Sequence, residues 1–151
     1  MLSRYKSIVI AIDSSDDSNH VLEAVQELGE RDAVDYHVIT VIPPVATAVA
    51  GMDAAAFAAS WPLQDLEDEI TKNATSSVKQ RVADHGISTD KVHMRHGKPS
   101  SVIHAFAEEV GADLIVVGSH GRTGFGRLVL GSTANAVLHG SPCDVLTIRL
   151  K

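Results

Sequence analysis

Apolar runs and helical repeats alternate along this chain. Residues 7–12 (SIVIAI) form a continuous run rich in β-branched side chains, which is typical of a strand covered on both faces. After a cluster of capping residues at 13–18, Val21, Val25 and Leu28 recur at helical spacing. The same alternation predicts further strands over residues 33–42, 91–97, 113–118 and 144–150, and further helices from Leu66 to about residue 84, from Pro99 to Gly111 and from Ser132 to His139.

Strands that alternate with helices are typical of a parallel sheet with helices on both faces. We therefore expect one doubly wound α/β domain over residues 1–151, with five parallel strands in the order 3-2-1-4-5. In such sheets, ligands bind outside the carboxyl ends of the strands, where the direction of winding reverses. With this order the reversal lies between the first and fourth strands, so Asp13 is expected beside the segment that follows Gly118.

One segment breaks the alternation. Residues 45–60 (VATAVAGMDAAAFAAS) are rich in alanine and have no clear period. They are interpreted either as a surface excursion, with room for a short helix, or as a lid or partner-contact loop, because they leave the carboxyl end of a strand. The sequence leaves both interpretations open.

Glycines crowd the segment after the fourth predicted strand, where five of the eleven in the chain lie between Gly118 and Gly131. Gly121 and Gly126 have the spacing of a P-loop, but Arg127 follows where that motif needs lysine. The dinucleotide fingerprint fails as well, because Val129 stands where a third glycine is required. Glycines after a strand still let backbone N–H groups approach an anion. A phosphate cradle and an ordinary glycine-rich connector therefore both stay open.

Composition and charge narrow the class of partner. The formal net charge of −6 argues against a nucleic-acid partner, which needs a basic face. The apolar run before Asp13 is too short for a signal peptide or a membrane span, so a cytoplasmic protein is expected.

No metal site is expected, because His93 and His96 are three apart on a predicted strand and point to opposite faces. Cys143 is interpreted as a small buried apolar residue rather than a nucleophile.

The spacing within the glycine-rich segment resembles a known signature. Gly118-Ser119-His120-Gly121, then nine residues, then Gly131-Ser132 is similar to the Gly-x2-Gly-x9-Gly-Ser/Thr motif of nucleotide-binding universal stress proteins. The stretches KSIVIAIDSSDDS, HVITVI and SPCDVLTI also resemble the first, second and last strands of that family. The resemblance covers nearly the whole chain and is weakest over residues 45–60.

The resemblance implies an ATP site. Asp13 matches the aspartate that contacts the ribose or the adenine side, and Val41 matches the position whose backbone pairs with the adenine edge. Mg²⁺ or Mn²⁺ would be bridged mainly by the phosphates, so no set of protein ligands is expected. The positions implied around the ribose and phosphates are Gly118, His120, Gly121, Arg122, Gly131, Ser132 and Thr133.

Three functions follow from this interpretation. The first is an ATP-binding regulatory protein of the stress response, acting on a partner that the sequence does not identify. The second is a slow ATPase, for which no residue identifies a catalytic base. The third is a nucleotide-free interaction module. A homodimer is expected through the last strand, which begins at Asp144 and ends at Leu150, because it forms an apolar sheet edge and because family members commonly dimerise there.

Overall fold

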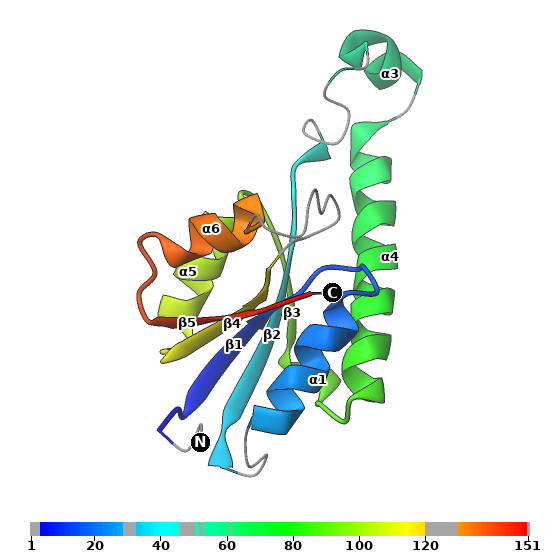
Figure 1. The fold of residues 1–151 in the computed structure, drawn as a ribbon. Coiled ribbons are helices and arrows are strands. Elements are labelled where there is room, and N and C mark those ends of the chain that lie inside the picture. Colours follow the sequence, from blue (N-terminus) through cyan, green and yellow to red (C-terminus); the bar gives the residue numbers. More distant parts are fainter. Residues whose placement is uncertain are drawn as a thin grey trace.

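A single parallel sheet organises the protein. The computed structural model describes residues 4–28, 33–45, 51, 53–60, 62–119 and 130–150. Its five strands are all parallel and lie in the order β3-β2-β1-β4-β5, which confirms the expected doubly wound topology (Figure 1). The strands are β1 (Ser7–Ala11), β2 (Asp35–Ile42), β3 (Val92–His96), β4 (Leu114–Gly118) and β5 (Asp144–Ile148).

Helices cover both faces of this sheet. α1 and α4 pack on one face, and α5 and α6 pack on the other (Figure 1). The crossovers between β1, β2 and β3 therefore run on the first face, and those between β3, β4 and β5 run on the second. The helices are α1 (Ser18–Leu28), α3 (Ala54–Ser60), α4 (Leu63–Asp84), α5 (Pro99–Glu109) and α6 (Ser132–Leu138), with a short 3-10 turn η2 (Thr89–Lys91) before β3.

Each face of the sheet has its own apolar core. Ile8 and Ile10 of β1 pack with α1 and α4, whereas Val9 between them packs with α5 and α6. All three side chains are fully buried. A central strand covered on both faces needs apolar side chains at every position, which explains the unbroken run seen in the sequence.

Several boundaries differ from those expected. β2 begins at Asp35, because its pairing with β1 begins at Ser7, and α4 begins at Leu63, directly after Pro62. β5 ends at Ile148, two residues before the expected Leu150. Leu150 leaves the sheet because its N–H donates to Oγ of Ser119 at 3.0 Å and its side chain is buried.

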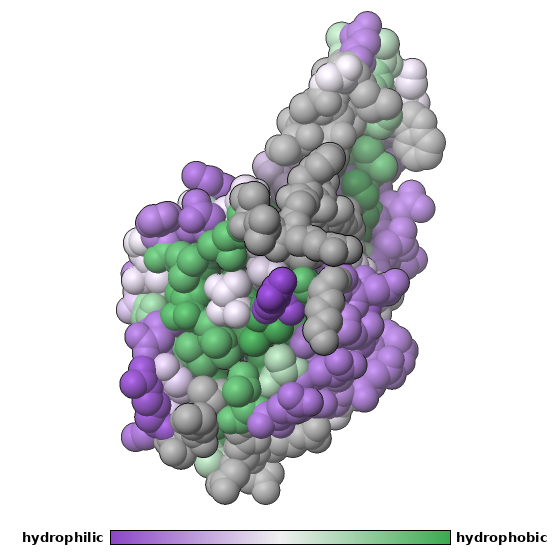
Figure 2. All heavy atoms as spheres, viewed as in Figure 1, coloured by the Kyte–Doolittle hydropathy of each residue, from purple (hydrophilic) through white to green (hydrophobic). Residues whose placement is uncertain are grey.

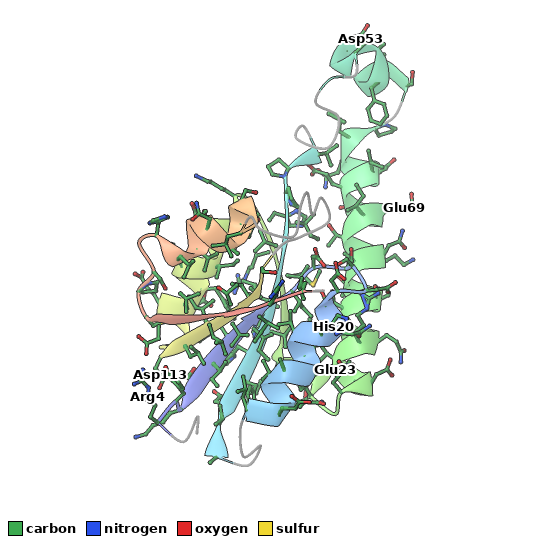
Figure 3. The ribbon with its side chains drawn as sticks, in the orientation of Figure 1. Arg4, His20, Glu23, Asp53, Glu69 and Asp113 are labelled. Carbon is green, nitrogen blue, oxygen red and sulfur yellow. The ribbon has the colours of Figure 1, made fainter. Side chains whose placement is uncertain are left out.

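The alanine-rich segment contains a helix. α3 forms over Ala54–Ser60, and α4 continues the chain back along the sheet. Asp53 lies just before α3, at the tip farthest from the amino ends of the strands (Figure 3). Residues 46–50 and 52 lie outside the described residues. The excursion thus includes a short helix.

One carboxylate joins the amino ends of β1 and β4. Asp113, just before β4, accepts hydrogen bonds from the backbone N–H of Lys6 (2.8 Å) and of Ser7 (3.2 Å), where β1 begins. Figure 3 shows Asp113 with Arg4 at this end of the molecule. These bonds hold the starts of β1 and β4 together, at the end of the sheet opposite to their carboxyl ends.

Candidate functional site

The direction of winding reverses between β1 and β4. These strands are neighbours from the pair Ile8–Leu114 to the pair Ala11–Val117, and the connections that leave them go to opposite faces. An opening between diverging connections at the carboxyl ends is the usual ligand site of this fold. Asp13 follows β1 and Gly118 ends β4, so the two lie at adjacent strand ends. His120, Gly121 and Arg122 lie outside the described residues.

Only one of the two carboxylate oxygens of Asp13 is held in place. Oδ1 accepts hydrogen bonds from the N–H of Ser15 (2.9 Å), from Oγ of Ser15 (2.5 Å) and from Oγ of Ser18 (3.1 Å). For Oδ2, no partner is recorded within the described part of the chain. Asp13 is only half-buried, so its carboxylate is oriented through one oxygen while the other is available to a ligand hydroxyl.

Ser18 braces Asp13 from the start of α1. Its hydroxyl accepts a hydrogen bond from the N–H of Asp13 at 3.2 Å. The single hydroxyl proton is shared between two acceptors, the Asp13 carbonyl oxygen at 2.8 Å and Oδ1 at 3.1 Å. Ser18 is only 3% exposed, so these bonds form largely out of contact with water. The contact of Ser18 with Asp13 differs from the helix-capping role expected for the serines of this loop.

The backbone of Val41 points into the space beside β1. The carbonyl oxygen of Ile39 accepts from the N–H of Ile12 at 3.1 Å, whereas that of Ile42 accepts from Gly97 in the direction of β3, at 3.2 Å. Successive residues of a strand turn their N–H and C=O groups to alternate sides, so those of Val41 face the same side as Ile39. The paired part of β1 has ended there, and no partner for either group is recorded among the residues described. Val41 thus presents one donor and one acceptor at this edge.

Ser119 closes the glycine-rich segment. Its carbonyl oxygen accepts from the N–H of Gly131 at 2.6 Å, and its own N–H donates to the carbonyl of Ile148 at 2.8 Å. The two ends of the segment between Ser119 and Gly131 therefore meet beside the end of β4. Residues 120–129, between these two ends, lie outside the described part of the chain.

Gly118 packs closely against the core. A Cβ atom at this position would lie 2.9 Å from Cδ1 of Leu150 and 3.3 Å from Cγ2 of Val21. Both neighbours belong to the core between the sheet and α1. This packing role was not expected from the sequence, because residue spacing does not show where Leu150 lies.

The start of α6 is open to solvent. Gly131 is the N-cap residue, and Ser132 and Thr133 in the first turn are exposed. First-turn N–H groups have no acceptor within their own helix. The structure therefore brings Asp13, Val41, Gly118, Gly131, Ser132 and Thr133 to the carboxyl side of the sheet, on three neighbouring strands and the helix that follows β4.

Two hollows lined by described residues lie away from Asp13, Gly118 and the start of α6. One, of about 390 Å³, lies between the ends of β2 and β3 and the first half of α4, and Pro44, Glu67 and His96 help to line it. The other, of about 430 Å³, lies beside the start of β2, where Asp35 pairs with Lys91 at 2.7 Å. Neither contains Asp13 or the residues around Gly131.

The histidines on β3 separate as expected. The His93 ring lies 4.7 Å from that of Phe106 on α5, whereas Nε2 of His96 lies 3.3 Å from Oγ1 of Thr71 on α4. Burial lowers the pKa of His93, and nearby His37 and Arg95 lower it further. Within the described ranges, no three histidine, cysteine, aspartate or glutamate residues are placed to hold a metal ion.

Cys143 packs against the core beneath α5 and α6. Burial raises the pKa of its thiol above the ordinary value, which keeps it protonated at neutral pH. Cys143 is only partly buried, so the expected apolar packing is present but the expected full burial is not. Over the helices that the structure describes, none is long and apolar enough to cross a membrane.

Known sequences resemble this chain along its full length. The pattern of the universal stress protein family matches residues 4–149. Universal stress protein A homolog 2 of Coxiella burnetii is 34% identical, over 99% of both chains. A universal stress protein of Methanocaldococcus jannaschii is 36% identical, over 96% of this chain and 82% of its own.

Solved structures share the fold. One, a hypothetical protein solved as a test of assigning biochemical function from structure, has a TM-score of 0.78 and 26% identity, over 97% of both chains. Another is a universal stress protein in complex with cAMP, with a TM-score of 0.58 and 22% identity, covering 96% of this chain and 97% of its own. By sequence and by fold, this chain belongs to the universal stress protein family.

Proposed function

We propose that this protein binds ATP at the carboxyl edge of β1 and β4 and acts as a nucleotide-dependent regulator in the stress response. The observation that carries the proposal is the hydrogen bonding of the Asp13 carboxylate. Its Oδ1 is held by Ser15 and Ser18, while for Oδ2 no partner is recorded in the described part of the chain. An oriented carboxylate with one available oxygen suits the two hydroxyl groups of a ribose, which are hydrogen-bond donors.

The neighbouring groups supply what the rest of the nucleotide needs. Val41 offers a backbone donor and acceptor for the adenine edge. Ser119 and Gly131 meet at the end of β4, and Ser132 and Thr133 add exposed hydroxyls where the phosphates would lie. Within the glycine-rich segment we propose His120, Gly121 and Arg122 as further contacts. Neutral N–H donors suit an anion in a protein whose formal net charge is −6.

A divalent ion would be held mainly by the phosphates. Mg²⁺ keeps several waters and binds through substrate phosphates with one or two protein carboxylates at most. Asp13 is the acidic side chain at this strand end, which fits such a site and offers no cage for an ion alone. When bound, Mg²⁺ would neutralise phosphate charge.

The relatives support a nucleotide of this class. A universal stress protein of the same fold has been solved with cAMP, which shares adenine, ribose and phosphate with ATP. At 22% identity that structure supports only the ability of this sheet to hold an adenine nucleotide. We therefore take cAMP as the competing ligand in the test.

Calorimetric titration tests the proposal. ATP, with and without Mg²⁺, is expected to bind the parent protein more tightly than cAMP, whereas Asp13→Ala and Gly121→Val weaken binding. Asp17→Ala, in the same loop but with no hydrogen bond from its side chain to Asp13 recorded, is the matched control. Variants at Asp13 and Gly121 that bind as well as the parent would refute the site. A parent that binds no nucleotide would favour the interaction module.

Phosphate release in a single turnover separates the regulator from a slow ATPase. We expect release from bound ATP no faster than in buffer, because no residue near Asp13 is identified as a base. Faster release that Asp13→Ala abolishes would favour the ATPase.

We also propose that two copies pair through β5. This strand is an edge of the sheet, so one row of its backbone groups is unpaired. Val145, Leu146 and Ile148 are half-buried, and Figure 2 shows apolar side chains gathered on the face that carries β5. A dimer mass in sedimentation at micromolar protein is expected, and Leu146→Lys should shift it toward monomer. A parent of monomer mass would contradict this pairing.

A further inference from the structure

One side chain of α4 holds the loop that carries Asp13. Nη1 of Arg81, in the last turn of α4, donates to the carbonyl oxygens of Ser14 at 2.8 Å and Ser15 at 2.7 Å. Nη2 donates to Oδ1 of Asp16 at 2.7 Å. A guanidinium presents its donors in a rigid planar fork, so one group fixes three consecutive residues. These residues directly follow Asp13.

The bonds to the carbonyl oxygens matter more than the ion pair. The Arg81 side chain is 17% exposed, whereas that of Asp16 is 96% exposed. An ion pair with so exposed a carboxylate contributes little, because water and salt screen it. The carbonyls belong to the half-buried residues Ser14 and Ser15, and losing a charged donor to such a group is costly.

We propose that Arg81 is a positioning residue for the nucleotide, acting through Asp13 without touching the ligand. Ser15 links Arg81 to Asp13. Arg81 donates to the carbonyl oxygen of Ser15, and the N–H and Oγ of Ser15 donate to Oδ1 of Asp13. Fixing Ser15 fixes the direction of Oδ2, the oxygen that would meet the ribose hydroxyls. This inference rests on the proposed ATP site and adds a residue from a different helix, far from the motif.

The test compares two ligands that differ only in the ribose hydroxyls. Arg81→Met is expected to weaken ATP binding about three- to tenfold while changing the affinity for 2′,3′-dideoxy-ATP by less than about twofold. Arg81→Lys, which keeps the charge and loses the fork, should fall between the parent and Arg81→Met. Asp16→Asn is the matched control, with an expected change below about twofold for both ligands. Equal losses for ATP and the dideoxy ligand, or a loss in Asp16→Asn as large as in Arg81→Met, would overturn the proposal.

Hydrogen exchange in the nucleotide-free protein separates this proposal from the proposed function. The N–H groups of Asp13 and Ser15 are hydrogen-bonded within the loop, to Oγ of Ser18 and Oδ1 of Asp13. We expect both to exchange several-fold faster in Arg81→Met and Arg81→Lys, and at the parent rate in Asp16→Asn. Unchanged exchange in both Arg81 variants would overturn the positioning role even if ATP binds. If the parent binds no ATP, the proposed function fails, and the exchange rates still decide whether Arg81 holds the loop.

Discussion

The N–H of Leu150 donates to Oγ of Ser119 at 3.0 Å, and this bond turns the end of the chain across the end of β4. The Leu150 side chain then covers Gly118, so the residue that ends β4 is enclosed by a residue thirty-two positions later in the sequence. The glycine-rich segment therefore begins at a packed point of the core, and that packing is independent of any ligand.

Gly118→Ala is expected to lower the free energy of unfolding by about 1 kcal/mol. The added Cβ would lie 2.9 Å from Cδ1 of Leu150 and 3.3 Å from Cγ2 of Val21. This loss of free energy of unfolding lies near the lower end of the range for overpacked cores, because Cδ1 of Leu150 is the far end of a flexible side chain and can shift. Urea denaturation measures it.

Leu150→Ala supplies the control for that substitution. In the Leu150→Ala background, Gly118→Ala should lower the free energy of unfolding by less, because the nearest clashing atom has been removed. A double-mutant cycle measures this difference as non-additivity. Full additivity would show that the two residues are not in contact.

Ser18→Ala should lower the free energy of unfolding by about 1–2 kcal/mol. The substitution leaves the N–H of Asp13 without its acceptor at a site that is 3% exposed. Thermal or urea unfolding reports the loss. Ser101→Ala, at an exposed position within α5, serves as the control and should be close to neutral. Equal effects of the two substitutions would rule out the contact with Asp13.

Asp113→Ala is expected to cost about 1–2 kcal/mol, because two backbone N–H groups at the start of β1 lose a charged acceptor. Asp113→Asn keeps one acceptor oxygen and should lose less. Hydrogen exchange at Lys6 and Ser7 should accelerate in the alanine variant before any change appears in α4. Parent-like exchange at both positions would exclude this role.

His93 makes stability depend on pH. It faces His37 of β2, Arg95 of β3, Glu109 of α5 and Lys91 of η2, and burial, His37 and Arg95 lower its pKa below the ordinary value of 6.5. The unfolded chain then binds a proton more readily than the folded one. Stability is complete above about pH 6.5 and falls as pH decreases toward the folded pKa.

His93→Phe keeps a ring beside Phe106 and removes the titration. Its free energy of unfolding should fall less than that of the parent between pH 7 and pH 5, measured by urea denaturation. A His93 variant with the slope of the parent would exclude His93 as the cause.

Much of the fold was predictable from the alternation of apolar patterns. The run at residues 8–12 has no polar position, which is typical of a central strand with helices on both faces. The order of the strands places Asp13 beside the end of β4, so the topology predicted which strand ends meet. The start of β2 and the end of β5 were less predictable, because pairing with β1 decides where β2 begins and the contact of Leu150 with Ser119 decides where β5 stops.

Sequence by itself determined the class of fold, the position of the switch point and the family, because periodicity and short motifs are local properties. Tertiary structure alone decided that Leu150 covers Gly118 and that Arg81, on α4, holds the loop that follows Asp13. Each of these contacts joins residues through geometry that spacing does not encode. Arg81 lies 67 positions from Ser14, and only the packing of α4 against the same face as α1 brings the two together.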